Sequence, residues 1–238
     1  MDAPTRLPVP RDTGRLADSG TVPIDVSAPA TWLVPLGEPG SLSGQNCTIL
    51  RTDVVGFSSG ARNYKDRLLI RDALFRMTHT MLRDIADVRS EDRGDGMLTV
   101  VWPAIPTSMI IERLLKRMLP ALVEHNSTYA DSTRFQLRAA IGVGPVVSDS
   151  MGFSGDAIIE VSRLVEALPF KRAMIASGAS LGVIATSFIY ETVLKHDRDL
   201  AGYRHVRFKV KECKNAAWMR VFDAAIPSPG DPGRAVAC

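Results

Sequence analysis

The stretch EDRGDGMLTV, residues 91–100, decides the fold of this chain. Gly94, Asp95 and Gly96 have turn chemistry, because glycine adopts positive φ without strain and Asp bonds to its own backbone. The run MLTVVW that follows, residues 97–102, is typical of a strand, and a short strand precedes the turn. The stretch therefore predicts a β-hairpin. A solvated acid at a hairpin tip accounts for Asp95, unless the rest of the chain brings other groups to it.

The composition is that of one globular domain with tails. The chain has 238 residues, of which 45% are hydrophobic and 23% charged, and these fractions are ordinary for a folded domain. A formal charge of +3, from 29 basic and 26 acidic residues, is too balanced to predict binding to nucleic acid.

Cysteine usage and the first residues predict a cytoplasmic protein. Cys47, Cys213 and Cys238 are widely spaced, form no CxxC motif and have no histidine cluster, so neither a zinc site nor a disulfide framework is expected. The opening MDAPTRLPVPRDTGRL contains no apolar signal core. Residues 173–190 are uncharged but too polar for a membrane span, and we expect a buried strand around residues 181–185 instead.

Three regions are predicted along the chain. Residues 1–44 carry many Pro, Gly and Ser without a sustained period, and we expect a disordered leader there. Residues 225–238 are expected to be a flexible tail. The domain between them, residues 45–224, contains the strand and helix patterns.

Strands and helices alternate in the first half of this domain. Residues 46–55 are rich in β-formers, and residues 64–87 predict a helix whose apolar stripe is formed by Ile70, Leu74, Met77, Met81 and Ile85. After the hairpin, Pro106 opens a second helix, which Pro120 kinks or ends.

The second half continues the alternation. A strand is predicted over residues 134–144, a helix over residues 155–168 that Pro169 stops, and closing strands over residues 205–211 and 217–222. The order is βαββαβ with additions. We predict an α+β fold, in which helices pack on one face of a mainly antiparallel sheet.

The predicted topology brings two acids together. Asp53 ends the first strand and Asp95 lies in the hairpin. In a βαββ unit the first strand commonly lies beside the third, because the helix crosses over, so both carboxylates would meet at one end of a strand pair. Carboxylate oxygens are the ligands that hard divalent cations prefer. Gly56 allows a close turn after Asp53, where free amides could bind phosphate.

Five stretches, in chain order, resemble the motifs of one enzyme family. They are RTDVVGFS (51–58), EDRGDGMLTV (91–100), LRAAIGVGPVV (137–147), GDAIIEVSRL (155–164) and FKVKECKNAAWMRVF (208–222). They are similar to the two metal-binding stretches, a central strand, a helix and the closing lysine-bearing strands of class III nucleotidyl cyclases, the adenylate and guanylate cyclases. The resemblance covers residues 46–223 and implies the ferredoxin-like βαββαβ core of that family.

The resemblance implies an activity. Such cyclases are lyases that convert a nucleoside triphosphate into a 3′,5′-cyclic nucleotide and pyrophosphate. Two divalent cations, Mg²⁺ or Mn²⁺, would be held by Asp53, Val54 and Asp95. The residues implied for phosphate binding are Gly56, Phe57, Ser58, Lys211 and Lys214.

The resemblance also implies a dimer. Arg163 would stabilise charge on the transferring phosphate, which is mainly an electrostatic task. Since the family builds its sites across a two-fold axis, Arg163 would serve the partner's cations in a homodimer with two sites.

Three positions depart from the family pattern. Ile159 stands where the family has an Asn that positions the ribose, four residues before Arg163 on the same helix face. At the two base-reading positions the chain has Glu91, which goes with guanine, and Gly152, which fits neither the adenine nor the guanine set. The base therefore stays open, and it includes the pyrimidines used by related phage-defence cyclases.

Two hypotheses follow from these matches and departures. An active cyclase is favoured because both aspartates and Arg163 are present. A degenerate cyclase-homology module, which binds a nucleotide or a partner and acts by dimerisation, is favoured by Ile159 and Gly152. Arg138, on an alternating strand, is expected to be a surface residue.

Overall fold

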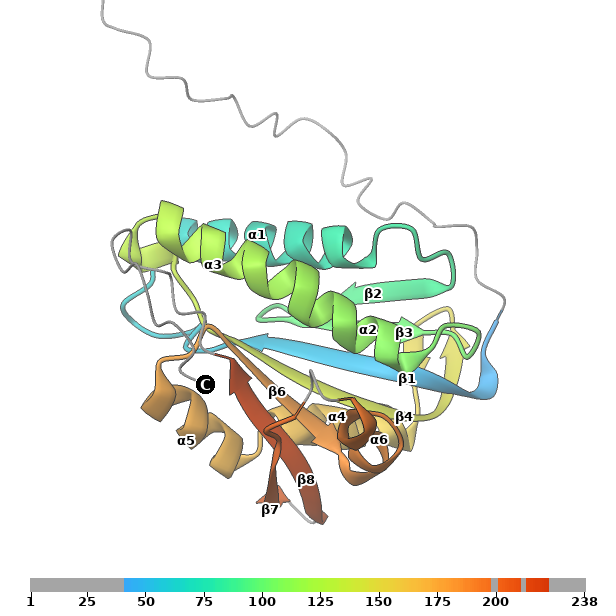
Figure 1. Cartoon of the computed structure of the whole chain (residues 1–238). Helices are drawn as coiled ribbons and strands as arrows, with labels where there is room; N and C mark the ends of the chain where they lie inside the picture. Colours follow the sequence, from blue (N-terminus) through green and yellow to red (C-terminus); the bar gives the residue numbers. More distant parts are fainter. Residues whose placement is uncertain (1–40, 198–200, 211–212, 223–238) are drawn as a thin grey trace, which may run out of the picture. The chain divides into compact units, whose positions relative to one another are not determined.

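A computed structural model describes residues 41–197, 201–210 and 213–222 (Figure 1). The strands are β1 (Ser43–Val54), β2 (Val88–Asp92), β3 (Met97–Val101), β4 (Leu137–Asp149), β5 (Gly152–Ser154), β6 (Leu181–Thr186), β7 (Arg204–Val210) and β8 (Cys213–Phe222). The longer helices are α1 (Tyr64–Leu82), α2 (Thr107–Arg113), α3 (Leu119–Thr128), α4 (Asp156–Val165), α5 (Leu168–Ser177) and α6 (Ser187–Thr192). The predicted tail and nearly all of the predicted leader lie outside these ranges.

The sheet is mainly antiparallel, as predicted. Its order is β2-β3-β1-β4-β6-β8-β7, and β5 pairs with β4. The first strand does lie beside the third, because β1 pairs with β3 on one side and with β4 on the other. The β4–β6 pair is parallel and the others are antiparallel. Figure 1 shows β1 crossing the middle of the domain, so its end is surrounded by other elements.

Helix α1 begins at a capping box. Asn63 accepts a hydrogen bond from the Asp66 amide, and the Asp66 carboxylate accepts one from the Asn63 amide. The predicted apolar stripe of the helix is buried. The helix ends at Leu82, earlier than predicted, because Asp84 adopts a φ of 70°, outside the helical region.

Two prolines have other effects than predicted. Pro120 does not end its helix: a π-helical turn over Leu114–Met118 precedes α3, and its wider spacing accommodates a residue without an amide hydrogen. Pro169 does not stop α4, which already ends at Val165; it lies in the first turn of α5, a helix that the sequence pattern did not indicate.

Helices cover both faces of the sheet, and the prediction of one covered face is wrong. One apolar cluster joins α1, α2 and α3 to the sheet, and a second joins α4 and α5 to it. Where α4 crosses β4, this second face is formed by small residues, although Ile49, Leu98, Val100 and Ile184 of the neighbouring strands also belong to the cluster. A Cβ on Gly142 would lie 2.7 Å from Val161 of α4, and one on Gly144 would lie 2.5 Å from the Ala157 Cβ. These glycines allow α4 to pack closely over β4.

None of the helices in the described ranges combines the length and apolarity needed to span a membrane.

Candidate active-site cleft

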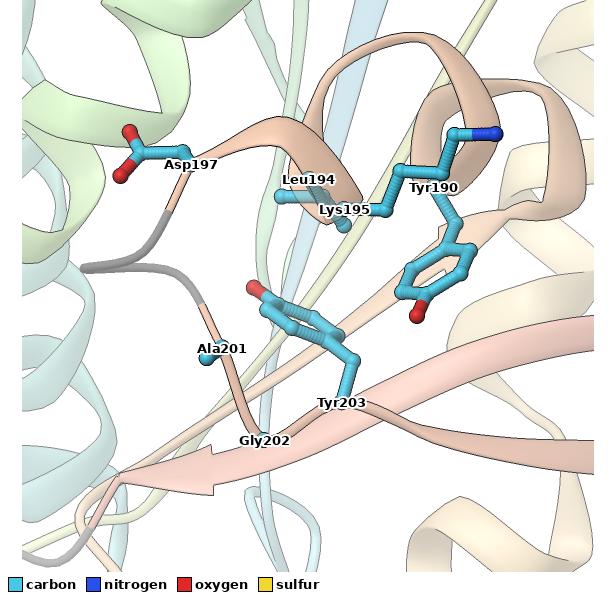
Figure 2. A pocket seen from close by; sticks show the side chains of 7 residues that line it. All are labelled: Tyr190, Leu194, Lys195, Asp197, Ala201, Gly202 and Tyr203. Atoms are coloured by element: carbon cyan, nitrogen blue, oxygen red, sulfur yellow. The ribbon is translucent and has the colours of Figure 1, made fainter.

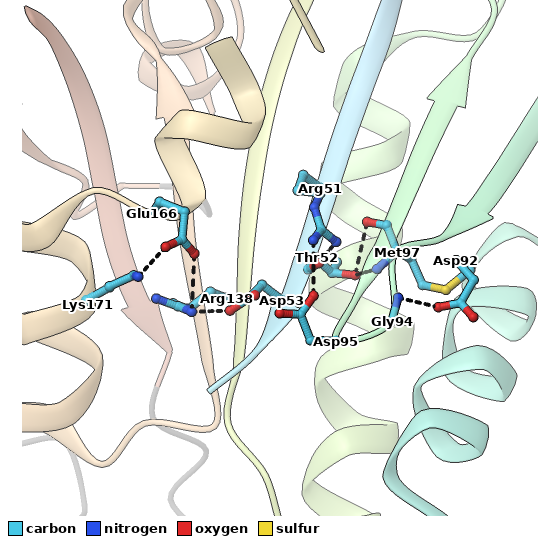
Figure 3. Close-up of polar contacts among 10 residues, drawn as sticks. All are labelled: Arg51, Thr52, Asp53, Asp92, Gly94, Asp95, Met97, Arg138, Glu166 and Lys171. Atoms are coloured by element: carbon cyan, nitrogen blue, oxygen red, sulfur yellow. Dashed lines mark hydrogen bonds and ion pairs between the residues drawn. The ribbon is translucent and has the colours of Figure 1, made fainter. Parts of the chain in front are cut away.

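The hairpin between β2 and β3 is attached to the end of β1 by backbone and side-chain hydrogen bonds. The Val54 amide donates to the Asp95 carbonyl oxygen at 2.8 Å. The Met97 amide donates to the Thr52 hydroxyl at 3.1 Å. A side chain on Gly96 would overlap the Thr52 carbonyl oxygen, so only glycine allows this approach. The structure thus brings Asp53 and Asp95 together, as Figure 3 shows.

Both carboxylates line one cleft of about 570 Å³ between the hairpin and α4. Its other lining residues are Arg51, Arg93, Leu98, Phe153, Ile158, Ser162, Val165 and Glu166. The strands and the hairpin contribute four charged residues to the wall, whereas α4 contributes Ile158, Ser162 and Val165 and, at its C-terminal cap, Glu166.

Asp53 is buried and paired. Arg138 Nη2 donates to Asp53 Oδ2, and the same atom lies 3.7 Å from Glu166 Oε1. Glu166 is in turn paired with Lys171 of α5 (Figure 3). Burial raises the pKa of the Asp53 carboxyl; Arg138 opposes this effect without cancelling it, and the charges of Asp95 and Glu166 add to it.

The expectation that Arg138 is a surface residue is wrong. It is 7% exposed and directly opposite Asp53 in the β1–β4 register. Its face of β4 is covered by the second helical layer, which the sequence pattern did not reveal.

Asp95 is half-buried and paired more loosely than Asp53. Its side chain is 43% exposed, and Oδ1 accepts a hydrogen bond from Arg51 Nη2 at 3.3 Å. The Arg51 side chain is 13% exposed, and its Nη1 donates to the Thr52 carbonyl oxygen at 2.6 Å.

The turn after Asp53 is built on Gly56, which has a φ of 66°. The Phe57 amide donates to the Val54 carbonyl oxygen at 3.3 Å, and the Ser59 amide donates to that of Gly56 at 3.1 Å. These hydrogen bonds within the turn already use the amides of Phe57 and Ser59, and Ser58 lies between these two residues in the chain. Binding of phosphate by Gly56, Phe57 and Ser58 stays a prediction.

Arg163 and Ile159 do not line the cleft of their own chain. The face of α4 that lines it carries Ile158, Ser162 and Val165. Ile159 is 48% exposed and Arg163 is half-buried on an adjacent face of the helix. One chain therefore does not bring Arg163 to Asp53 and Asp95.

The two lysines predicted to bind phosphate come from the closing stretch of the sequence, residues 208–222. Lys211 lies outside the described residues. Lys214 belongs to β8, where it is opposite Lys209, and its side chain lies outside the described part of the molecule.

The two positions predicted to read the base, Glu91 and Gly152, lie next to each other. A Cβ on Gly152, whose φ is 131°, would lie 2.7 Å from Glu91 Oε1. Glu91 Oε2 accepts a hydrogen bond from Arg93 Nη2 at 2.7 Å, whereas Oε1 is buried and has no hydrogen-bond partner within the described residues. A buried acceptor without a partner is costly, and a ligand N–H would satisfy it.

The carboxylates fit divalent cations. Asp53, Asp95 and the Val54 carbonyl supply hard oxygen donors, and a cation would offset the burial, and the smaller repulsion from Asp95 and Glu166, that raise the pKa of Asp53. No group of three or more His, Cys, Asp or Glu side chains suited to a metal occurs in the described ranges. Further ligands would come from phosphate and water, as is usual for Mg²⁺.

A second cavity of about 220 Å³ lies near α6 (Figure 2). It is lined by Tyr190, Leu194, Lys195, Asp197, Ala201, Gly202 and Tyr203. Burial raises the pKa of the Tyr203 hydroxyl. None of the predicted site residues lines this cavity, so the cleft with the two aspartates is the candidate active site.

Comparison with known proteins supports the fold. No protein-family model matches the sequence, and no curated protein matches it. Among solved structures, an adenylate/guanylate cyclase/hydrolase from Silicibacter pomeroyi superposes with a TM-score of 0.55 at 20% identity, covering 76% of this chain and 99% of the other. The guanylate cyclase domain of RhGC from Catenaria anguillulae, in complex with GTP, gives 0.51 at 17% identity, covering 74% and 97%.

The core of a rhodopsin-guanylyl cyclase with converted specificity, in complex with ATPalphaS, gives 0.51 at 16% identity, covering 74% of this chain and 94% of the other. The chain has the fold of adenylate and guanylate cyclase catalytic domains, and the resemblance inferred from the five motifs is confirmed at the level of the fold.

Proposed function

We propose that this chain is a nucleotidyl cyclase, a phosphorus–oxygen lyase that converts a cytoplasmic nucleoside triphosphate into a 3′,5′-cyclic nucleotide and pyrophosphate. The observation that carries the proposal is the meeting of Asp53 and Asp95 in one cleft on the fold of cyclase catalytic domains. The five sequence motifs support it independently.

The residues of the cleft have separate roles in this proposal. Asp53, Asp95 and the Val54 carbonyl hold two divalent cations, Mg²⁺ or Mn²⁺. When bound, such cations lower the pKa of the ribose 3′-hydroxyl and neutralise charge on the triphosphate. The turn at Gly56 lies against the phosphates, which Lys211 and Lys214 also contact. Glu91 offers its unpaired oxygen to an N–H of the base.

A second copy of the chain completes the site. Arg163 does not line its own cleft, while its neighbour on α4, Ile159, is exposed. Both features suit a homodimer in which Arg163 contacts the phosphates held by the partner. Mixing inactive Asp95→Ala and Arg163→Ala proteins should restore activity, since each mixed dimer contains one intact site. If mixed dimers form without any activity, both groups act within one chain.

The direct test is incubation with each of the four ribonucleoside triphosphates and with Mn²⁺ or Mg²⁺, followed by identification of the product by mass. We expect one or more nucleotides to yield a cyclic monophosphate and pyrophosphate. Absence of cyclic product from all four nucleotides with both metals would overturn the enzymatic proposal.

A second candidate is a cyclase-homology module that binds nucleotide without turning it over. It is favoured because each aspartate already has an arginine partner and because Ile159 cannot hydrogen-bond a ribose. The change Ile159→Asn separates the candidates. In a working cyclase it should raise turnover by about ten-fold or more, because a positioned polar group near developing charge is worth several kcal/mol.

In a module neither protein makes a cyclic nucleotide, while calorimetry still detects metal-dependent binding of triphosphate. Since Ile159 is 48% exposed in one chain, the substitution should leave the folding of the monomer intact.

A further inference from the structure

Arg51 places a positive charge inside the cleft, directly on a predicted cation ligand. It lines the cleft with Asp53 and Asp95, and its Nη2 donates to Asp95 Oδ1 at 3.3 Å. Because side chains alternate along a strand, Arg51 and Asp53 lie on the same face of β1. The guanidinium therefore contacts Asp95 directly and lies on the side of β1 that carries Asp53.

The surroundings hold this guanidinium in place. Its Nη1 donates to the Thr52 carbonyl oxygen at 2.6 Å, and a Cβ on Gly96 would lie 2.6 Å from the same nitrogen. The guanidinium of Arg51 thus occupies the space that a side chain at Gly96 would fill. Arg138 differs, because it is buried behind Asp53 and does not line the cleft.

The Arg51–Asp95 contact is suited to exchange. At 3.3 Å it is longer than a typical charge-assisted hydrogen bond, and Asp95 is 43% exposed. A divalent cation bound at Asp95 would repel the guanidinium, and a triphosphate in the same cleft would attract it. Arginine is well matched to phosphate, because its planar fork binds two oxygens at once.

We infer that Arg51 is a tethered cation that occupies Asp95 in the empty cleft and transfers to the triphosphate when a divalent cation takes its place. This inference rests on the proposed function, since it requires a nucleotide and a metal in the cleft. It assigns Arg51 two roles with opposite signs: competition with metal and attraction of nucleotide.

The experiment measures both affinities in one variant, Arg51→Gln. Binding of Mn²⁺ alone is followed by electron paramagnetic resonance, and binding of each 3′-deoxyribonucleoside triphosphate at saturating Mn²⁺ is followed by calorimetry; these nucleotides lack the attacking hydroxyl and cannot cyclise. The matched control is Arg71→Gln, since Arg71 pairs with Asp92 of the same hairpin but does not line the cleft.

We expect Arg51→Gln to bind Mn²⁺ alone about five-fold more tightly, because a competing charge is removed. We expect it to bind nucleotide about ten-fold more weakly, because a charged phosphate contact is lost. The Arg71→Gln control should match the wild type in both measurements. If the two affinities of Arg51→Gln change in the same direction, or stay at the control values, the inference is overturned while the proposed function stands.

Two further outcomes are informative. If Arg51→Gln does not fold, Arg51→Lys replaces it: this variant keeps the charge, so binding of Mn²⁺ alone should stay within about two-fold of wild type while nucleotide binding weakens, since an ammonium cannot bind two oxygens as a fork does. An equal loss of both affinities contradicts the inference. If wild-type protein binds neither Mn²⁺ nor nucleotide, the proposed function fails and the inference fails with it.

Discussion

Each aspartate of the cleft is paired with an arginine, but the two ion pairs differ in how deeply they are buried. On the strand side, Asp53 and Arg138 have side chains that are 5% and 9% exposed. On the hairpin side, Asp95 is 43% exposed and Arg51 13%. Breaking a buried pair leaves an uncompensated charge, whereas removal of Arg51 leaves Asp95 in contact with water, because the Asp95 side chain is partly exposed. The strand side therefore belongs to the framework of the fold, and the hairpin side is where ligands can exchange.

Removal of either aspartate should have the largest effect, and it tests whether the two sides are equivalent in chemistry. Asp53→Ala and Asp95→Ala should each lower cyclisation by at least about a hundred-fold, because one carboxylate cannot hold two cations. Only Asp53→Ala should also lower the denaturation midpoint, since it leaves Arg138 buried without its partner. Near-full activity in either variant would show that the metal assignment is wrong.

Removal of either arginine shows how much its ion pair contributes to the stability of the fold. Arg138→Ala should cost about 3–5 kcal/mol in the free energy of unfolding, and Arg51→Ala less than about 1 kcal/mol. Urea denaturation of the metal-free proteins measures both. Equal losses in the two variants would remove the distinction between framework and exchange site.

The Arg138→Ala deficit should also depend on pH. Burial already raises the pKa of Asp53, and loss of Arg138 raises it further. A carboxyl whose pKa is higher in the folded state than in the unfolded state binds more protons when the protein is folded. The contribution of this group to the stability of the protein is therefore greatest below the unfolded pKa near 4, and it is lost as the pH rises through the folded pKa. The loss of unfolding free energy caused by Arg138→Ala should therefore be larger at pH 8 than at pH 4.

The two hairpin glycines provide a smaller test of the same contact. Gly96→Ala should cost about 3 kcal/mol, because its Cβ meets the Thr52 carbonyl oxygen and Arg51. Gly94 has a φ of 85° but open space around it, so Gly94→Ala should cost about 1–2 kcal/mol of backbone strain. Thermal unfolding compares the two variants. A smaller loss of stability in Gly96→Ala than in Gly94→Ala would show that the hairpin does not pack closely against β1.

The smallest expected effect is at Asp92, outside the cleft. Burial raises the pKa of this carboxyl, but hydrogen bonds from Arg71 and the Gly94 amide outweigh it and lower the pKa. A lowered folded pKa gives stability above the unfolded value that is lost as pH falls through the folded one. Asp92→Asn should thus cost less than about 1 kcal/mol at pH 7, and this cost should shrink as the pH falls below the unfolded pKa near 4. A cost that does not change over this pH range would assign it to packing.

The sequence predicted the elements that local periodicity controls. The hairpin at Gly94–Gly96, the buried stripe of α1 and the strands that carry Asp53 and Asp95 follow from the chemistry of neighbouring residues. The meeting of the two acids was also predictable, because a crossover helix places the first strand beside the third. Arg51 could have been singled out too, since it lies two residues before Asp53 on the same face of an alternating strand.

The surroundings of those acids were not predictable. Glu166 reaches the cleft only because α4 packs closely on Gly142 and Gly144. The second helical layer gave no clear signal in β4, because that strand meets α4 through Gly142 and Gly144 and not through an alternating apolar run. For the same reason Arg138 was expected on the surface.

The sequence by itself determined the hairpin, the longer strands, helix α1 and the presence of two carboxylates at one strand end, since turn chemistry, capping and periodicity act between residues close in the chain. Only the tertiary structure decided which arginine pairs with which aspartate. Arg138 and Asp53 are 85 residues apart, and Arg51 and Asp95 are 44 apart. Their pairing depends on strand register and on the layer that excludes water, and burial makes one pair part of the framework while exposure leaves the other free to exchange.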